Sequence, residues 1–383
     1  MVQLNRILTV LVAASFSLTM FSCASEESSS NVIDIDNATD LTVNMSEYYE
    51  NMEYIPLETS EKSLVGKIQN VHVTDELIAV VSSGNCHVFD RQTGKFLRKI
   101  GMKGNGPNEY NSIVRGQSIN GQKNTLLATR AAGPIEYSLI DGSVVEPVIK
   151  ANIPMFFMGK YMHVADDIWA KGEFNFRGNV PNKLYFFNRE KVIDSVANTS
   201  FYTPNKGAIS FNMGEFYFYR YNNSARYKFA YSDTIFDITS RVMKPMWVLK
   251  TQNSMSEIAD IRGDFKKMNQ VSPNYHSIYN MLETDNYLLF NSGYQKEILP
   301  FLFSKNNNQL IKLENDGFVN DIDGGIAFWP TYTTADQEAI TVYEAHKFLE
   351  EIDATKASDK LKSLVSDIKE EDNPIIAIAQ PKK

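Results

Sequence analysis

A polar turn that closes a β-hairpin recurs along this chain at near-constant spacing. Each turn follows an apolar residue at the end of a short strand, and the positions directly after that residue are 90, 141, 188, 237 and 304. The gaps between these positions are 51, 47, 49 and 67 residues. A near-constant period of this size marks a repeat array, and short strands joined by tight turns are typical of the blades of a β-propeller. The sequence therefore predicts an all-β chain with five such blades.

The chain outside the five repeats supplies one further blade. Apolar stretches remain at residues 318–332 and 375–379, and a short strand at residues 54–57 precedes the first repeat. A sheet built from both ends of the chain would close the ring and remove the open sheet edge. Seven blades would need more chain than is left. We therefore expect a six-bladed β-propeller in which the strand at 54–57 pairs with late residues.

Two segments show helical periodicity. Residues 254–268, inside the longest gap, carry Ile258, Ile261 and Phe265 at helical spacing, which predicts an inserted helix of about four turns. A cap over one propeller face is a possible role for this helix, and a loop is the alternative. Residues 334–370 begin with a capping-box pattern and then carry two apolar stripes, which predicts two C-terminal helices that end before Pro374. We expect these helices to dock on the propeller.

The first 22 residues are typical of a signal peptide. A single charge, Arg6, precedes an apolar run over residues 7–20 that is too short to span a bilayer. The run ends at Ser22-Cys23, which resembles a lipobox, where cleavage and acylation would make Cys23 a lipid-bearing N-terminus. An ordinary signal peptide with an incidental cysteine is the alternative.

Residues 23–50 begin with a small, polar and acidic stretch typical of a flexible tether, so we place the propeller at residues 51–383. The acidic pair at Glu26-Glu27 also resembles a surface-export signal of some Gram-negative lineages. We expect a protein that is lipid-anchored in the Gram-negative envelope, at the outer membrane. A periplasmic and a surface-exposed orientation both stay open.

Cysteine usage and net charge narrow the class of protein. With Cys23 lipidated, Cys86 has no partner, so we expect no disulfide in the mature chain. Removal of residues 1–22 takes away one basic residue, which leaves 37 basic and 46 acidic residues and changes the formal net charge from −8 to −9. An acidic chain without a basic run is a poor candidate for binding nucleic acid. We also expect no metal or other cofactor.

The hairpin at residues 86–100 leads into a glycine-rich crossing, whose distinctive residues are Gly101, Gly104, Gly106, Pro107, Glu109 and Tyr110. This stretch resembles the first-blade signature of the bacterial six-bladed β-propeller lipoproteins, a TolB-like propeller group. Two later stretches are similar to motifs of the same family, namely residues 233–236 (Asp-Thr-Ile-Phe) and residues 373–379 (Asn-Pro and an apolar strand). The resemblance implies a fold and a location, and it implies no common reaction.

Each candidate chemical motif departs from the pattern that its chemistry requires. The glycines at 101–106 lack the Gly-Lys-Ser/Thr of a phosphate loop, and Pro107 removes a backbone donor. His163 with Asp166 and Asp167 could bind a metal ion, but the aspartates fit a hairpin turn equally well. Residues 320–325 approach a calcium loop and lack its later ligands. We predict a tight crossing at the first site and turns at the other two.

Two classes of function stay open. A non-catalytic module would use one propeller face to bind a protein, a peptide or a glycan. An enzyme, for example a lactonase-like, metal-dependent hydrolase or lyase, would gather Asp, Glu, Asn or His side chains at one end of the central channel. The aromatic strand at 215–221 could stack a ligand, although burial between blades predicts the same pattern. Five histidines and no nucleophile elbow favour the binding module.

Overall fold

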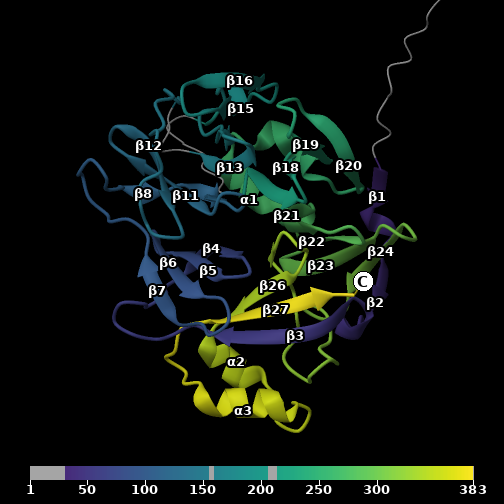
Figure 1. Ribbon diagram of the computed structural model, residues 1–383. Helices are drawn as coiled ribbons and strands as arrows, with labels where there is room; N and C mark the ends of the chain where they lie inside the picture. The colour runs from purple at the N-terminus through teal and green to yellow at the C-terminus, as the bar shows by residue number, and fades with distance from the viewer. Residues whose placement is uncertain (1–30, 155–158, 206–213, 383) are drawn as a thin grey trace, which may run out of the picture.

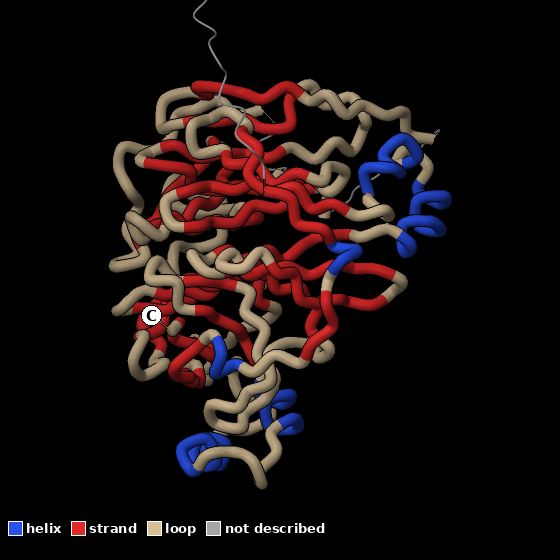
Figure 2. The backbone as a smooth tube through the Cα atoms, turned by 90° about the vertical axis from the view of Figure 1, so that its right-hand side faces the viewer, coloured by secondary structure: helices blue, strands red, loops and turns tan. Residues whose placement is uncertain are grey.

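The computed structural model describes residues 31–154, 159–205 and 214–382, and six β-sheets arranged around one axis make up most of it (Figure 1). This arrangement is a six-bladed β-propeller, which confirms the predicted fold class. The sheets stack through the body of the molecule, and the helical segments lie at its periphery (Figure 2). The predicted signal peptide and Cys23 lie outside the described residues. None of the described helices is long and apolar enough to cross a membrane.

The first three blades occupy residues 68–197. Blade 1 contains β4 (Ile68–Val73), β5 (Leu77–Ser82), β6 (Asn85–Asp90) and β7 (Phe96–Lys99). Blade 2 contains β8 (Ser112–Ile113), β10 (Ile119–Asn120), β11 (Thr125–Arg130) and β12 (Gly133–Ser138). Blade 3 contains β9 (Arg115–Gln117), β13 (Lys160–Ala165), β14 (Ile168–Gly172), β15 (Asn182–Phe187) and β16 (Val192–Ala197).

The other three blades include strands from the N-terminal segment. Blade 4 contains β17 (Phe216–Tyr221), β18 (Ser224–Phe229), β19 (Thr234–Asp237), β20 (Lys244–Lys250) and β1 (Asn31–Asp34). Blade 5 contains β21 (Ser277–Glu283), β22 (Tyr287–Tyr294), β23 (Glu297–Ser304), β24 (Gln309–Leu313) and β2 (Thr39–Leu41). Blade 6 contains β25 (Tyr332–Thr333), β26 (Ala339–Tyr343), β27 (Ile375–Pro381) and β3 (Tyr49–Pro56).

Each interface between neighbouring blades is filled by a cluster of buried apolar side chains. Between blades 1 and 2, for example, Cys86 and Val88 pack with Leu126 and Tyr137. Because the middle strands are buried on both faces, their sequences are apolar at consecutive positions, as in Leu77–Ser82. Burial raises the pKa of the Cys86 thiol to about 12, which makes it the inert core cysteine that the sequence predicts.

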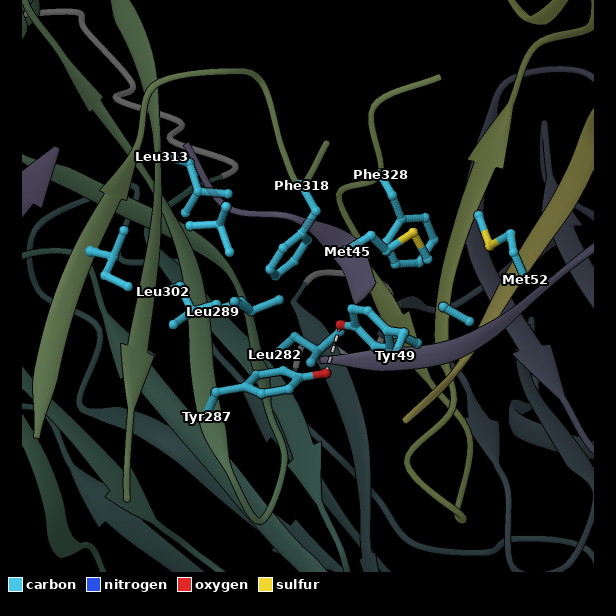
Figure 3. Packing of buried hydrophobic residues seen from close by; sticks show 14 of the residues in the cluster. Met45, Tyr49, Met52, Leu282, Tyr287, Leu289, Leu302, Leu313, Phe318 and Phe328 are labelled. Atoms are coloured by element: carbon cyan, nitrogen blue, oxygen red, sulfur yellow. Dashed lines mark hydrogen bonds between the residues drawn. The ribbon is translucent and has the colours of Figure 1, made fainter. Parts of the chain in front are cut away.

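The ring closes in blade 6, where β3 pairs antiparallel with β27. Tyr54 lies opposite Ala377 and Ile55 opposite Ile376, so the early strand pairs with the late one as the sequence predicts (Figure 1). The side chains of β3 also reach blade 5, where Tyr49 packs in a cluster with Tyr287 and Phe318 (Figure 3). The predicted contribution of residues 318–332 is smaller than expected, because that stretch is mostly loop around a bridge between Phe318 and Phe328.

Residues 31–50 differ from the tether that we expected over residues 23–50. β1 pairs in parallel with β20, and β2 pairs in parallel with β24, so each adds a fifth strand to the outer edge of its blade. Ile33 and Ile35 are buried in the core between blades 4 and 5. We name β1, β2 and β3 the N-terminal belt, because they line the rims of three consecutive blades. Burial of Ile33, Ile35, Val43 and Met45 explains why this segment is ordered.

The helical segments are shorter than predicted. The inserted segment forms η3 (Met255–Ile261), α1 (Phe265–Val271) and η4 (Ser272–Asn274) in place of one helix of four turns. Residues 339–343, predicted as helix, form strand β26 because their β-branched side chains pair with β27. The helices that follow are α2 (Ala345–Glu351) and α3 (Asp359–Asp367), and they pack against Tyr54 and Ile375 of blade 6. Two further 3-10 turns, η1 (Ile35–Asn37) and η2 (Met45–Glu47), join the strands of the belt.

The glycine-rich motif lies in the crossing from β7 to β8. The Glu109 carboxylate accepts a hydrogen bond of 2.8 Å from the Gly106 amide, and a Cβ atom at Gly104 would lie 1.8 Å from Glu109 Oε2. Tyr110 is fully buried, and its ring packs edge-on against Tyr137 of blade 2. The motif therefore forms a tight turn between two blades, and a side chain at position 104 would have to displace the Glu109 carboxylate.

Asn373 ties the last crossing of the ring together. Its side-chain nitrogen donates to the carbonyl oxygens of Glu58 at 2.7 Å and Ser63 at 2.8 Å, and its side-chain oxygen accepts from the Val65 amide at 2.9 Å. The residues that it joins lead from β3 of blade 6 to β4 of blade 1. A buried asparagine that bonds three backbone groups explains why an Asn-Pro pair precedes the final strand.

Candidate functional site

A cavity of about 300 Å³ opens at the end of the central axis where the first strand of each blade turns into the second. Its wall includes residues of β4, β10, β13, β17, β21 and β25, so all six blades contribute to it. The inserted segment at 255–274 lies at the other ends of these strands and does not line the cavity. The structure therefore does not place that segment as a cap over this cavity.

Strand β9 lies inside the ring and forms the floor of the cavity. Between β8 and β10 the chain leaves blade 2 and pairs in parallel with β13, with Gly116 opposite Tyr161. β9 also contacts β4 and β17, and Gln117 lines the cavity. Gly116 has a φ of +85°, and a Cβ atom there would lie 2.8 Å from the Tyr161 carbonyl oxygen. We call the cavity the central cup, because β9 crosses the channel beneath it.

Neutral polar side chains share the wall of the central cup with apolar ones such as Met162 and Met281. Threonine and tyrosine hydroxyls from β25 and its turn lie beside carboxamides from five blades. The carboxamides are Asn70, Gln117, Gln122, Asn222, Asn223 and Gln337. Each carboxamide offers both a hydrogen-bond donor and an acceptor, so the wall can pair with a ligand that is rich in hydroxyl groups.

Hydrogen bonds between turns hold the rim of the cup in place. Gln122 of blade 2 donates to Asn223 of blade 4 over 3.1 Å, across the intervening blade. Gln337 of blade 6 donates to the Asp285 carboxylate of blade 5 over 2.7 Å and accepts from the Asp285 amide over 2.8 Å. The Tyr221 hydroxyl donates to the same carboxylate over 2.8 Å, and these bonds keep the pKa of Asp285 below its usual range. The rim is therefore organised before any ligand arrives.

The ionisable residues deepest in the cup lie on blades 3 and 4. His163 is 1% exposed, and its Nε2 lies 2.9 Å from the Asp166 carbonyl oxygen. Burial lowers the pKa of His163 to about 4, so the ring is neutral at pH 7. The Arg220 guanidinium donates to the His163 carbonyl oxygen and lies 3.4 Å from its Nδ1. Burial also lowers the pKa of Arg220.

Glu283 also lines the cup, but its carboxylate is fully engaged. It accepts hydrogen bonds from the Tyr219 hydroxyl at 3.1 Å and the Trp247 indole at 3.1 Å. It also forms ion pairs with Arg226 at 3.2 Å and Lys305 at 2.9 Å. A buried carboxylate with four donors is a structural centre that joins blades 4 and 5, and no lone pair is left to act as a general base.

The structure places the other predicted residues in turns. Asp166 and Asp167 form the β13–β14 turn, where Asp167 pairs with Lys123 at 2.5 Å. The side chain of Asn320 bonds within residues 320–325 and to Tyr54, as a structural turn would. Within the described part of the chain, no group of three His, Cys, Asp or Glu side chains is placed to hold a metal ion. The strand at 216–221 is the inner strand of blade 4, and it contributes Tyr219 and Arg220 to the cup.

Sequence reasoning missed the residues that line the cup. Gln117 and Arg220 belong to no recognisable motif, and they come together only because the innermost strands converge on one axis. A signal was present in the stretch 114–119, where Gly116 and three polar residues separate Val114 from Ile119. Such an interruption is typical of a bulge or of close backbone approach.

Comparisons with known proteins identify the family. No curated protein matches the chain. A Bacteroides fragilis protein assigned to the exported proteins is similar in structure, with a TM-score of 0.69 and 17% identity over 92% of this chain and 100% of that one. A Bacteroides vulgatus member of the DUF4221 family has a TM-score of 0.52 and 10% identity, over 87% of this chain and 97% of that one. Both likenesses show a shared fold. A family model described as a domain of unknown function, DUF4934, matches residues 30–380, and the chain therefore belongs to the DUF4934 family.

Proposed function

We propose that this protein is a lipoprotein of the bacterial envelope that resembles the TolB-like propellers, and that it binds a glycan end in the central cup without catalysing a reaction. The wall of the cup carries the proposal, because neutral carboxamides and hydroxyls from five blades converge there. A sugar presents several hydroxyls in a fixed geometry, and such a wall can donate to some and accept from others. A volume of about 300 Å³ suits a small ligand or the end of a larger one.

The same wall favours binding over hydrolysis. A hydrolase needs a free base beside a nucleophile or a metal-bound water. Here Glu283 is saturated by four donors, and Nε2 of His163 is engaged with the Asp166 carbonyl oxygen. The hydrogen bonds of the rim also favour binding, because they fix the shape of the site before a ligand arrives.

Binding can be tested on residues 24–383, which lack the acylated Cys23, with an array of neutral, amino and acidic mono- and oligosaccharides. We expect binding to at least one group of sugars, and we expect Gln117→Leu in the floor of the cup to weaken it at least tenfold. The matched control Gln92→Leu changes an exposed turn residue and should bind as the wild type does. Failure of every sugar to bind, or equal binding by both variants, would refute a glycan site in the cup.

The envelope location rests on the lipobox at Ser22-Cys23 and agrees with the exported assignment of the Bacteroides fragilis neighbour. The acylated cysteine would anchor the chain to the outer membrane, and residues 24–30 would separate the lipid from the belt. In the native host, Cys23→Ala should move the protein from the membrane fraction to the soluble fraction, and mass spectrometry should find acyl chains on wild-type Cys23 alone. A wild-type protein without acyl mass would refute the anchor.

A further inference from the structure

We infer that the ligand of the central cup carries a carboxylate that pairs with Arg220, so that the cup selects an acidic sugar such as a uronic acid. This inference rests on the glycan-binding function proposed above. Arg220 lies near the end of β17, the innermost strand of blade 4, and lines the cup. Among the described residues that line the cup, Arg220 is the cationic side chain, and no carboxylate lies beside it.

The hydrogen bonds of Arg220 leave one side of its guanidinium unused. Nη2 donates to the His163 carbonyl oxygen, whereas Nη1 is buried and has no hydrogen-bond partner. No carboxylate of the described residues lies within 4.0 Å of this guanidinium. On the neighbouring strand, Arg226 is paired with both Asp237 and Glu283. Buried donors are almost always satisfied, and solvent does not reach Nη1 in this structure. A shift of the Arg220 side chain toward the cavity that it lines would let Nη1 pair with a ligand carboxylate.

The charges around the cup favour an anionic partner. His163 is neutral at pH 7, so it does not compete for a carboxylate and leaves Arg220 as the local charge. The charge of Glu283 is offset by Arg226 and Lys305. Asp75 and Asp336 line the mouth, where both are exposed to solvent and screened. Glu338 also lines the cup but lies 3.7 Å from Arg91, and the Asp285 carboxylate on the rim is held by Gln337 and Tyr221. Among the described residues of the lining, Arg220 is therefore the buried charge that has no opposite charge beside it.

A carboxylate is the anion whose shape fits a guanidinium, because its two oxygens match adjacent N–H groups. The rest of the ligand would face the carboxamides of the wall, such as Gln117 on the floor. A uronic acid combines one carboxylate with several hydroxyls and is small enough for a cup of about 300 Å³. An amino acid or a peptide end offers the carboxylate without the hydroxyls, so the wall favours the sugar.

Calorimetric titration of residues 24–383 with glucuronate, its methyl ester and glucose tests this inference. The three probes share ring hydroxyls and differ in the carboxylate. We expect glucuronate to bind at least tenfold more tightly than the ester or glucose, and we expect added salt to narrow the difference. Arg220→Gln should reduce the affinity for glucuronate to that for glucose, while Arg177→Gln, an exposed control, should leave both affinities unchanged.

The outcomes separate this inference from the proposed function. Equal binding of the three probes would overturn the role of Arg220 and leave a neutral glycan site standing. Absence of binding by any sugar would overturn the glycan site itself. Tighter binding of N-acetylglutamate than of glucuronate would overturn the assignment to an acidic sugar. The comparison of glucuronate with its ester uses the wild-type protein alone, so the test holds even if Arg220→Gln does not fold.

Discussion

The hydroxyl oxygens of Tyr49 and Tyr287 lie 2.6 Å apart in the buried core between blades 5 and 6 (Figure 3). Tyr49 comes from the N-terminal belt, and Tyr287 begins β22. Burial raises the pKa of Tyr287 to about 12, so both hydroxyls keep their protons at pH 7 and one donates to the other. Strand β3 completes blade 6, and this bond therefore also fixes it to blade 5.

Loss of either hydroxyl should destabilise the protein. Tyr49→Phe leaves the buried Tyr287 hydroxyl without this partner, which should cost about 1–3 kcal/mol of unfolding free energy. The double variant Tyr49→Phe/Tyr287→Phe removes both polar groups and should lose less than the sum of the two single losses. Urea denaturation of the four proteins in this cycle measures the coupling. Strictly additive losses would show that the two hydroxyls do not interact.

Truncation should show which part of the N-terminus belongs to the fold. Deletion of residues 1–30 leaves the belt intact and should not change the melting temperature. Deletion of residues 1–60 removes β3, leaves β27 with an unpaired edge and uncovers the apolar core, so we expect loss of cooperative melting. Deletion of residues 1–41 removes β1, η1 and β2 but keeps β3, and should lower the melting temperature to an intermediate value. Equal melting of all three proteins by circular dichroism would contradict the role of the belt.

The floor of the cup can be tested at one glycine. Gly116→Ala places a Cβ atom 2.8 Å from the Tyr161 carbonyl oxygen and also strains a φ of +85°. Gly142→Ala has a similar φ of +78° but meets nothing within 4 Å, so it isolates the conformational penalty of about 1 kcal/mol. We expect Gly116→Ala to lose clearly more unfolding free energy than Gly142→Ala. Similar losses in chemical denaturation would show that β9 does not pack tightly against β13.

Asn373 should be among the costly polar residues of this chain. Asn373→Ala removes three hydrogen bonds and leaves the Ser63 carbonyl oxygen and the Val65 amide without this partner, which should cost on the order of 3 kcal/mol. The Glu58 carbonyl oxygen keeps a hydrogen bond of 2.7 Å from the Ser63 hydroxyl. Asn373→Asp should lose nearly as much, because a carboxylate cannot donate to the two carbonyls. Asn306→Ala, in an exposed turn, serves as the control and should be nearly neutral in thermal melting. A mild effect of Asn373→Ala would contradict the bonding described for this crossing.

His163 should make the protein sensitive to acid. Its pKa of about 4 in the folded chain lies below the value of about 6.5 expected after unfolding. The unfolded chain therefore binds the proton more readily, and the stability present above pH 6.5 falls as the pH drops towards 4. Arg220 and Lys123 reinforce this effect, while the Asp166 carbonyl and the Asp167 carboxylate oppose it.

A matched pair of variants measures how much His163 contributes to this loss of stability in acid. Between pH 7 and pH 4.5, His163→Gln should lose less unfolding free energy than the wild type, by on the order of 2 kcal/mol. His346→Gln changes an exposed histidine and should follow the wild-type profile. Parallel profiles for the wild type and His163→Gln would show that this ring does not titrate differently in the folded chain.

The fold was predictable because its signals are local and repeated. A turn marks the end of a strand within a few residues. At Asp90, for example, the side chain accepts a hydrogen bond of 2.8 Å from the Thr93 amide. The belt was missed because β1 and β2 are only four and three residues long, too short for alternation to stand out. Strand β26 was read as helix because Val342 and Ala345 also fit a helical stripe. Only its pairing with β27 decides between the two.

The site was not predictable by the same means. Its residues are ordinary asparagines, glutamines and one arginine, and no spacing along the chain brings Gln117 near Arg220. They meet because a propeller directs the first strand of every blade to one axis, which is a property of the closed ring. The departure of β9 from blade 2 depends on the pairing of Gly116 with Tyr161, a residue that lies far from it in the sequence.

The N-terminal belt also sets an order in time. β1, β2 and β3 are synthesised first, yet their partners are β20, β24 and β27, the last of which ends at Pro381. A chain that emerges N-terminus first must keep these strands unpaired until nearly all of it has been delivered, and contacts this distant in sequence form slowly. A chain cut short before residue 375 has no β27 to receive β3. Closure of the ring thus depends on the two ends of the described chain together, because β3 has no pairing partner until β27 is present.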